Sequence, residues 1–246
     1  MALLFHGLVA DKFVTTFSSS AVFSAEYPVG VRLPYATKSD IISAMTYQEE
    51  RIIQVLDYLA DNIHGKRLSK LNALKLVYLA DRYHLRKYAS PILWDTYYAM
   101  QYGPVASTTK KLIEELFAAQ DGKTTEYISV TDSGKRTRRG EPILIIDSKK
   151  KPDLTQLSKT EREALNVALS QWPLHDDLVD YTHFFPEWKA AEDNINAGAT
   201  RIRMRYADFF LPCKRPSDEF CNVPQDVVDL NKEVFLEDAS FRNFRV

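Results

Sequence analysis

Apolar residues recur every three or four positions along two early stretches of the chain, a spacing that places them on one face of a helix. The first stretch follows Thr46 and Glu49, a pair that can cap a helix start reciprocally, and it predicts a helix over residues 47–63. The second opens at Ser69 and continues to about Tyr88. Its apolar residues cover more than one face, so we expect this helix to be central in its domain.

Two further helices are predicted downstream. Proline needs no amide partner at the first position of a helix, so Gly103 and Pro104 predict a sharp turn into a third helix that ends at Asp121. We expect the free amides at the start of this helix to face outward. Ser158 and Glu161 then repeat the reciprocal capping pattern and begin another helix.

Strand signals occur between these helices. Residues 125–130 and 142–146 are rich in β-forming side chains, and a polar loop with an Asp132-Ser133-Gly134 turn separates them. This pattern predicts one β-hairpin. Residues 202–210 fit a helix or a strand equally well. The fold class is therefore mainly α, a compact helical domain with one small β-hairpin. Shorter helical pieces are expected over residues 174–182 and 186–197.

The pattern changes at both ends of the chain. Residues 1–44 show neither the helical nor the strand spacing of apolar residues, and we interpret them as an N-terminal extension. We interpret residues 45–211 as the helical domain and residues 212–246 as an acidic tail. Residues 217–246 hold seven acidic and three basic groups, too polar to fold alone. Two arrangements stay open for this tail. It docks on the basic hairpin of its own domain, which we favour, or it becomes ordered only on a partner.

Composition narrows the classes of function. The 246 residues carry 32 basic and 33 acidic groups, a net charge of −1, so nucleic-acid binding would require a local patch. Cys213 and Cys221 are eight apart and fit reduced thiols better than a metal site. The uncharged run over residues 13–25 is too short to cross a bilayer, and residues 1–10 lack the basic residues of a secretory signal. We therefore expect a cytoplasmic protein with no membrane partner.

A basic cluster surrounds the predicted hairpin loop. Three acidic residues oppose it, and no aromatic residue is interleaved that could stack on bases. The default interpretation is a loop that is exposed to solvent. The next interpretation is a loop that binds an acidic surface of a partner. A nucleic-acid-binding regulator that uses the 135–151 hairpin stays open as an alternative function. The basic residues are Lys135, Arg136, Arg138, Arg139, Lys149, Lys150 and Lys151.

Motifs for catalysis and for metal or nucleotide cofactors are missing from the sequence. His175-Asp176 matches the dipeptide of metal-dependent HD phosphohydrolases, but the nearest upstream histidine, His84, is about ninety residues away. His183 is a lone imidazole. The sequence therefore predicts no enzyme, no metal and no cofactor, with an HD-like phosphohydrolase as the weakest alternative.

Three motifs in order carry a family resemblance. Residues 75–81 are KLVYLAD, residues 102–105 are YGPV, and residues 182–188 are THFFPEW. From about residue 47 to 211 the chain resembles the Panacea domain of SocA-like antitoxins and phage-associated proteins. The resemblance implies the antitoxin of a bacterial toxin–antitoxin pair, which neutralises a cognate toxin protein by direct binding. One relative acts as a protease adaptor, so a cellular protease is a further implied partner.

The resemblance also directs attention to the residues of these motifs as contacts for the toxin. Lys75 lies in an apolar helical run and must snorkel, pair with a carboxylate or lie under a partner; Asp81, at i+6, is on another face. For Tyr78 and Trp188 core packing is the favoured interpretation. The predicted partner-binding residues are Lys75, Tyr78, Tyr102, Gly103, Pro104, His183 and Trp188.

Overall fold

A computed structural model describes residues 45–119, 125–172, 177–213 and 223–241. Its contacts divide the chain into residues 1–35 and 36–246, and every described residue belongs to the second unit. The N-terminal extension predicted over residues 1–44 and the His175-Asp176 pair lie outside the described residues.

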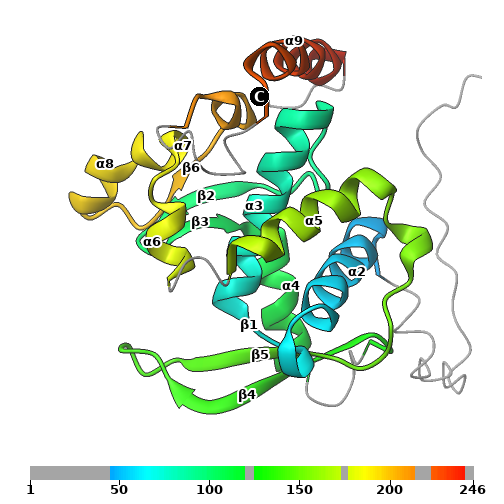
Figure 1. The fold of residues 1–246 in the computed structure, drawn as a ribbon. Coiled ribbons are helices and arrows are strands. Elements are labelled where there is room, and N and C mark those ends of the chain that lie inside the picture. Colours follow the sequence, from blue (N-terminus) through cyan, green and yellow to red (C-terminus); the bar gives the residue numbers. More distant parts are fainter. Residues whose placement is uncertain (1–44, 120–124, 173–176, 214–222, 242–246) are drawn as a thin grey trace, which may run out of the picture. The chain divides into compact units, whose positions relative to one another are not determined.

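Helix α3 (Lys70–Tyr88) is the centre of the domain, as predicted (Figure 1). The Ser69 side chain accepts a hydrogen bond from the amide of Asn72 and caps its start. Every residue from Ala73 to Arg86 is buried, because other elements cover all sides of this helix. They include α2 (Tyr47–Asp61), α5 (Lys159–Gln171), both sheets and α9 (Gln225–Phe241).

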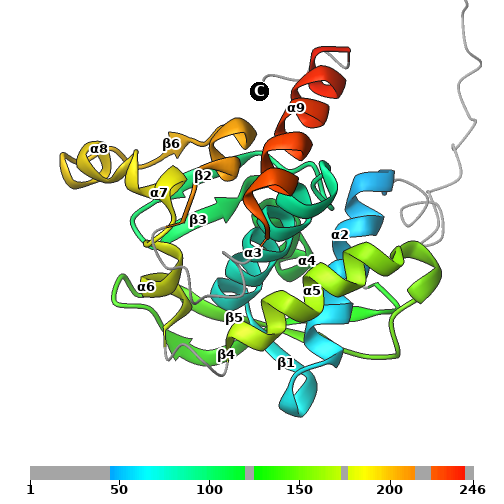
Figure 2. The same ribbon diagram turned by 45° about the horizontal axis from the view of Figure 1, so that its top comes forward.

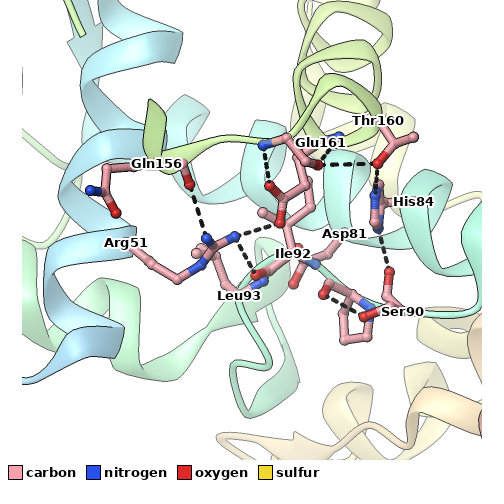
Figure 3. A network of polar contacts seen from close by, with 11 residues as sticks. Arg51, Asp81, His84, Ser90, Ile92, Leu93, Gln156, Thr160 and Glu161 are labelled. Carbon is pink, nitrogen blue, oxygen red and sulfur yellow. Dashed lines mark hydrogen bonds and ion pairs between the residues drawn. The ribbon is translucent and has the colours of Figure 1, made fainter. Parts of the chain in front are cut away.

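Reciprocal capping boxes start α2 and α5, as the sequence predicts. The Glu161 carboxylate of the second box also accepts a bond from Arg51 on α2, at 2.5 Å (Figure 3). Arg51 further donates to the carbonyls of Ile92 and Gln156. One guanidinium thus joins two helix starts and the loop that follows α3.

The predicted hairpin forms, with a third strand that the sequence did not indicate. Strand β5 (Pro142–Ser148) lies between β4 (Ile128–Arg136) and β1 (Arg67–Ser69), all antiparallel. The predicted turn at Asp132-Ser133-Gly134 is wrong as a hairpin turn: it shifts the register inside β4, and the chain reverses after Arg136. Two short 3₁₀ turns, His64–Lys66 and Leu154–Gln156, flank this layer.

A second three-stranded sheet was not predicted. Its order is β3 (Gly103–Ala106), β2 (Tyr97–Met100) and β6 (Ile202–Arg203). The expectation of one hairpin was therefore incomplete. The placement of Pro104 at a helix start was wrong, because Pro104 lies in β3 and α4 (Ser107–Ala118) begins after it. β3 is an edge strand, where proline is tolerated because its missing amide costs no bond to a neighbouring strand.

Between α5 and α9, the described residues form three short helices and the 3₁₀ segment that follows them. The sequence of residues 202–210 fitted a helix or a strand equally well, and the segment contains both strand β6 and the 3₁₀ segment η4 (Tyr206–Phe210). No helix in the described ranges is long and apolar enough to cross a membrane. The short helices are α6 (Leu178–Thr182), α7 (Pro186–Lys189) and α8 (Glu192–Asn196).

The described part of the acidic tail is helix α9, which packs on α3 and η4 (Figure 2). Phe235 is fully buried against the rings of Trp94, Tyr206 and Phe210. Asn231 donates a hydrogen bond to the carbonyl of Arg86. Contact with the parent domain agrees with the favoured arrangement, but helix α9 makes this contact with α3 and η4, whereas the favoured docking surface was the basic hairpin.

Candidate partner-binding site

Lys75 lies beneath the turn between β2 and β3. Its ammonium donates to the carbonyl of Pro104 at 2.9 Å, and no part of the residue is exposed. Burial lowers its pKa from 10.5 to about 7, and the charge of Asp177 opposes this shift. Asp81 is not its partner, as the helical spacing predicted. Lys75 therefore contacts the turn directly and supports it from below.

Gly103 brings this turn against α6. Its φ is +87°, a conformation that side chains disfavour. A Cβ atom there would lie 2.7 Å from Thr182 Oγ1 and 2.8 Å from Lys75 Nζ, with His183 Cδ2 at 3.3 Å. Glycine is thus required by both conformation and space.

His183 and Trp188 close the other side of the turn. Their rings stack with centroids 3.7 Å apart and an interplanar angle of 13°. The Trp188 indole donates to the carbonyl of Met100, the last residue of β2. Burial, followed by the charge of Lys75, lowers the pKa of His183, which favours the neutral imidazole. The structure thus brings together Lys75, Gly103, Pro104, His183 and Trp188.

Tyr78 belongs to a separate buried cluster on the same helix. Its hydroxyl donates to Glu187 at 2.5 Å, and Arg82 donates to the same carboxylate oxygen at 2.6 Å. The side chains of Arg82 and Glu187 are completely buried, and Arg82 also lies over the Phe185 ring. Sequence reasoning missed this ion pair, whose only signal was an arginine within a helix that is apolar on several faces. Tyr78 has the core role that its sequence context favoured.

The buried side chain of Asp81 shapes the segment between α3 and α4. Asp81, which lies beside Ile92 and Leu93 in Figure 3, accepts from the amides of both residues. It also accepts from the Tyr97 hydroxyl, and burial raises its pKa to about 7. His84, beside it, contacts the carbonyl of Ser90 and the Thr160 hydroxyl. These contacts hold the loop that leads into β2.

Asp95 caps α4 from a distance. Its carboxylate accepts from the amides of Thr108 and Thr109, at 2.7 and 2.8 Å, and from the Thr109 hydroxyl. The expectation that these amides face outward was therefore wrong. A buried carboxylate 13 or 14 residues upstream satisfies them, so the start of α4 is not an open anion site.

Exposure separates the predicted contact residues into two groups. The Tyr102 side chain is 48% exposed at the β2–β3 turn, and His183 is partly exposed. The other five predicted residues are buried. The site is thus a supported turn that displays one aromatic side chain. Across the described ranges, no group of three or more His, Cys, Asp or Glu residues could hold a metal ion.

Residues 74–189 match the model of the family described as antitoxin SocA-like, Panacea domain. The match begins one residue before Lys75 and ends one residue after Trp188, so it encloses the whole site. Comparisons with curated proteins and with solved structures found no match.

Proposed function

We propose that this protein is the antitoxin of a bacterial toxin–antitoxin pair and neutralises its cognate toxin by direct binding at the β2–β3 turn. The observation that carries the proposal is the Panacea match over residues 74–189, which encloses the turn and its supports. Tyr102 is the exposed aromatic residue at its tip. Aromatic side chains of this kind are frequent anchors of protein interfaces.

Preorganisation supports this role for the turn. Lys75 bonds the Pro104 carbonyl, Trp188 bonds the Met100 carbonyl, and Gly103 leaves no space for a side chain. A turn held from three sides loses little conformational entropy when a partner docks. The contact energy that Tyr102 contributes would therefore increase affinity, because little of it is offset by the cost of ordering the turn.

The proposal assigns binding and no catalysis to this domain. Three buried charged groups on α3 bond to the protein's own backbone and side chains: Lys75 to Pro104, Arg82 to Glu187, and Asp81 to Ile92. His84, the upstream histidine that an HD-like phosphohydrolase would require, contacts Ser90 and Thr160 within the fold. That alternative has no support from the described residues.

Co-expression with the toxin from the adjacent reading frame tests the proposal. Wild-type protein should restore growth and copurify with the toxin, and Tyr102→Asp should abolish both. The matched control is Tyr47→Asp, since Tyr47 is also exposed but lies at the start of α2. Lys75 and Pro104 are poor test positions, because both are buried and their substitution would disturb the fold itself.

Two results would contradict the proposal: toxicity that the wild-type protein does not relieve, or rescue that Tyr102→Asp leaves intact. The amount of toxin in rescued cells separates two modes of neutralisation. Toxin that persists in a complex indicates direct blocking. Toxin that disappears unless a protease is deleted indicates delivery to that protease.

A further inference from the structure

The tip of the basic hairpin lies beside the β2–β3 turn. The Arg139 guanidinium donates to the Gln101 side chain at 2.8 Å, across 38 residues of sequence. On the other side of this turn, Ala99 pairs with Ile202, so the antiparallel register places Arg201 opposite Met100. Figures 1 and 2 both show the hairpin tip, the β2–β3 turn and α6 on the same side of the domain.

Four cations around this turn form no salt bridge with any acidic residue that the structure describes. We name Lys135, Arg138, Arg139 and Arg201 the basic rim; all four are exposed. Within the described part of the chain none of them forms an ion pair, whereas Arg136 pairs with Asp132 and Lys150 with Glu126. Uncompensated charges on an exposed rim create a positive field that can attract an oppositely charged partner.

Two exposed aromatic side chains accompany the rim. Tyr102 is 48% exposed and Phe184 is 46% exposed. Each is next in sequence to one of two residues in close approach, Gly103 and His183, so both lie beside the same turn. Apolar anchors surrounded by charged groups are the usual composition of a protein-binding surface.

Acidic side chains on the neighbouring helices define what the surface accepts. Asp177 and Asp180 are exposed at the start of α6, and Glu192 begins α8. Their charges act on Lys75 or His183, so they lie close to the turn. A continuous phosphate backbone would be repelled by these carboxylates, whereas a folded protein can present acidic groups only where the rim requires them.

We propose that the basic rim, together with Tyr102 and Phe184, docks an acidic protein surface that presents an apolar pocket to the two rings. This inference rests on the proposed antitoxin function and specifies the chemistry of the toxin face. The cations accelerate encounter with the acidic face, and the aromatic rings determine how long the complex lasts.

Association kinetics of the full chain with toxin purified from the adjacent reading frame test this division. At 50 mM salt, Arg138→Glu with Arg139→Glu should lower the association rate constant about tenfold or more, and 300 mM salt should remove most of the difference. Phe184→Ala should instead raise the dissociation rate constant about tenfold. The charge-matched control is Lys159→Glu with Lys232→Glu on α5 and α9, which should change the association rate less than threefold.

The outcomes separate this inference from the proposed function. If wild-type protein does not bind the toxin, the proposed function fails. If it binds but the rim reversal and the control behave alike, only the rim assignment is overturned. A labelled single-stranded 20-mer serves as the competing probe. Salt-sensitive binding of this oligonucleotide that the rim reversal abolishes, with toxin binding unchanged, would reassign the rim to nucleic acid and overturn the proposal.

Discussion

Helix α3 and the outer half of the β4–β5 hairpin both carry charges, and they use them in opposite ways. On α3, Arg82 is completely buried and bonds a buried carboxylate, while Lys75 is buried against a backbone carbonyl. On the hairpin, Arg138 and Arg139 are exposed and form no ion pair among the described residues. A buried charge has a large effect on stability, because its removal leaves a desolvated partner behind. An exposed charge acts mainly on what approaches from solvent.

The largest expected effect is the loss of the buried pair on α3. Glu187→Ala leaves the Arg82 guanidinium and the Tyr78 hydroxyl without their acceptor in a dry interior. We expect the free energy of unfolding to fall by about 3–5 kcal/mol, measured by denaturant titration. A loss below about 1 kcal/mol would show that water reaches Arg82, and the contrast with the hairpin would disappear.

Gly103 gives the next largest effect and has a control within the same chain. Gly103→Ala forces an unfavourable φ and places Cβ against Thr182 and Lys75, so we expect a loss of about 2–4 kcal/mol. Gly140 on the hairpin has a similar φ of +82°, but a Cβ added there would meet nothing within 4 Å. Gly140→Ala should therefore cost only about 1 kcal/mol. Equal losses of stability in the two variants would mean that the close contacts of a Cβ atom at position 103 do not contribute to the effect.

A pH-dependent effect is expected from Lys75. Its pKa is about 7 in the folded protein and 10.5 without burial, so between these values the unfolded chain binds more protons. Wild-type stability should therefore gain up to about 1.4 kcal/mol per pH unit from this group as pH rises from 7 to 10. Lys75→Met removes that gain. Denaturant titrations at several pH values measure the difference between the two proteins, and a difference independent of pH would contradict the assignment.

The same variant should change His183. The Lys75 charge lowers the pKa of His183, so its removal should move the imidazole titration to higher pH. Proton NMR of the histidine side chains measures this shift. An unchanged titration would place the ammonium too far from His183 to act on it.

The smallest expected effect on stability belongs to the hairpin. Arg138→Ala with Arg139→Ala should change the free energy of unfolding by no more than about 0.5 kcal/mol, because both side chains are exposed. Thermal melting is sufficient to measure this. A large loss would mean that the rim supports the fold, as α3 does.

Local sequence patterns predicted the helices of this domain well. Thr46, Ser69 and Ser158 cap α2, α3 and α5 as their spacing indicated, because capping depends on residues only three positions apart. The second sheet escaped prediction, since its strands have four, four and two residues, too few to show a period. The cap of α4 by Asp95 also has no local signal.

The candidate site was predictable only in part. The family resemblance grouped Lys75, Gly103 and Trp188, but their burial depends on tertiary packing that no local pattern reports. Phe184 was not singled out, because its exposure follows from the way α6 and α7 meet the turn. Nor could the sequence place Arg139 beside Gln101, a contact between residues 38 positions apart that forms only when the hairpin tip lies next to the β2–β3 turn.

The buried pair on α3 also has a consequence for synthesis of the protein. Glu187 follows Arg82 by 105 residues, and the ribosome adds about 5–20 residues per second. Arg82 therefore waits on the order of 5–20 s for its carboxylate to be made. The carbonyls of Phe209 and Leu211, which Arg86 requires, are made later still. The nascent domain thus completes the hydrogen bonds of its central helix only after residue 211 has been made, and until then the buried cations of α3 are without these partners.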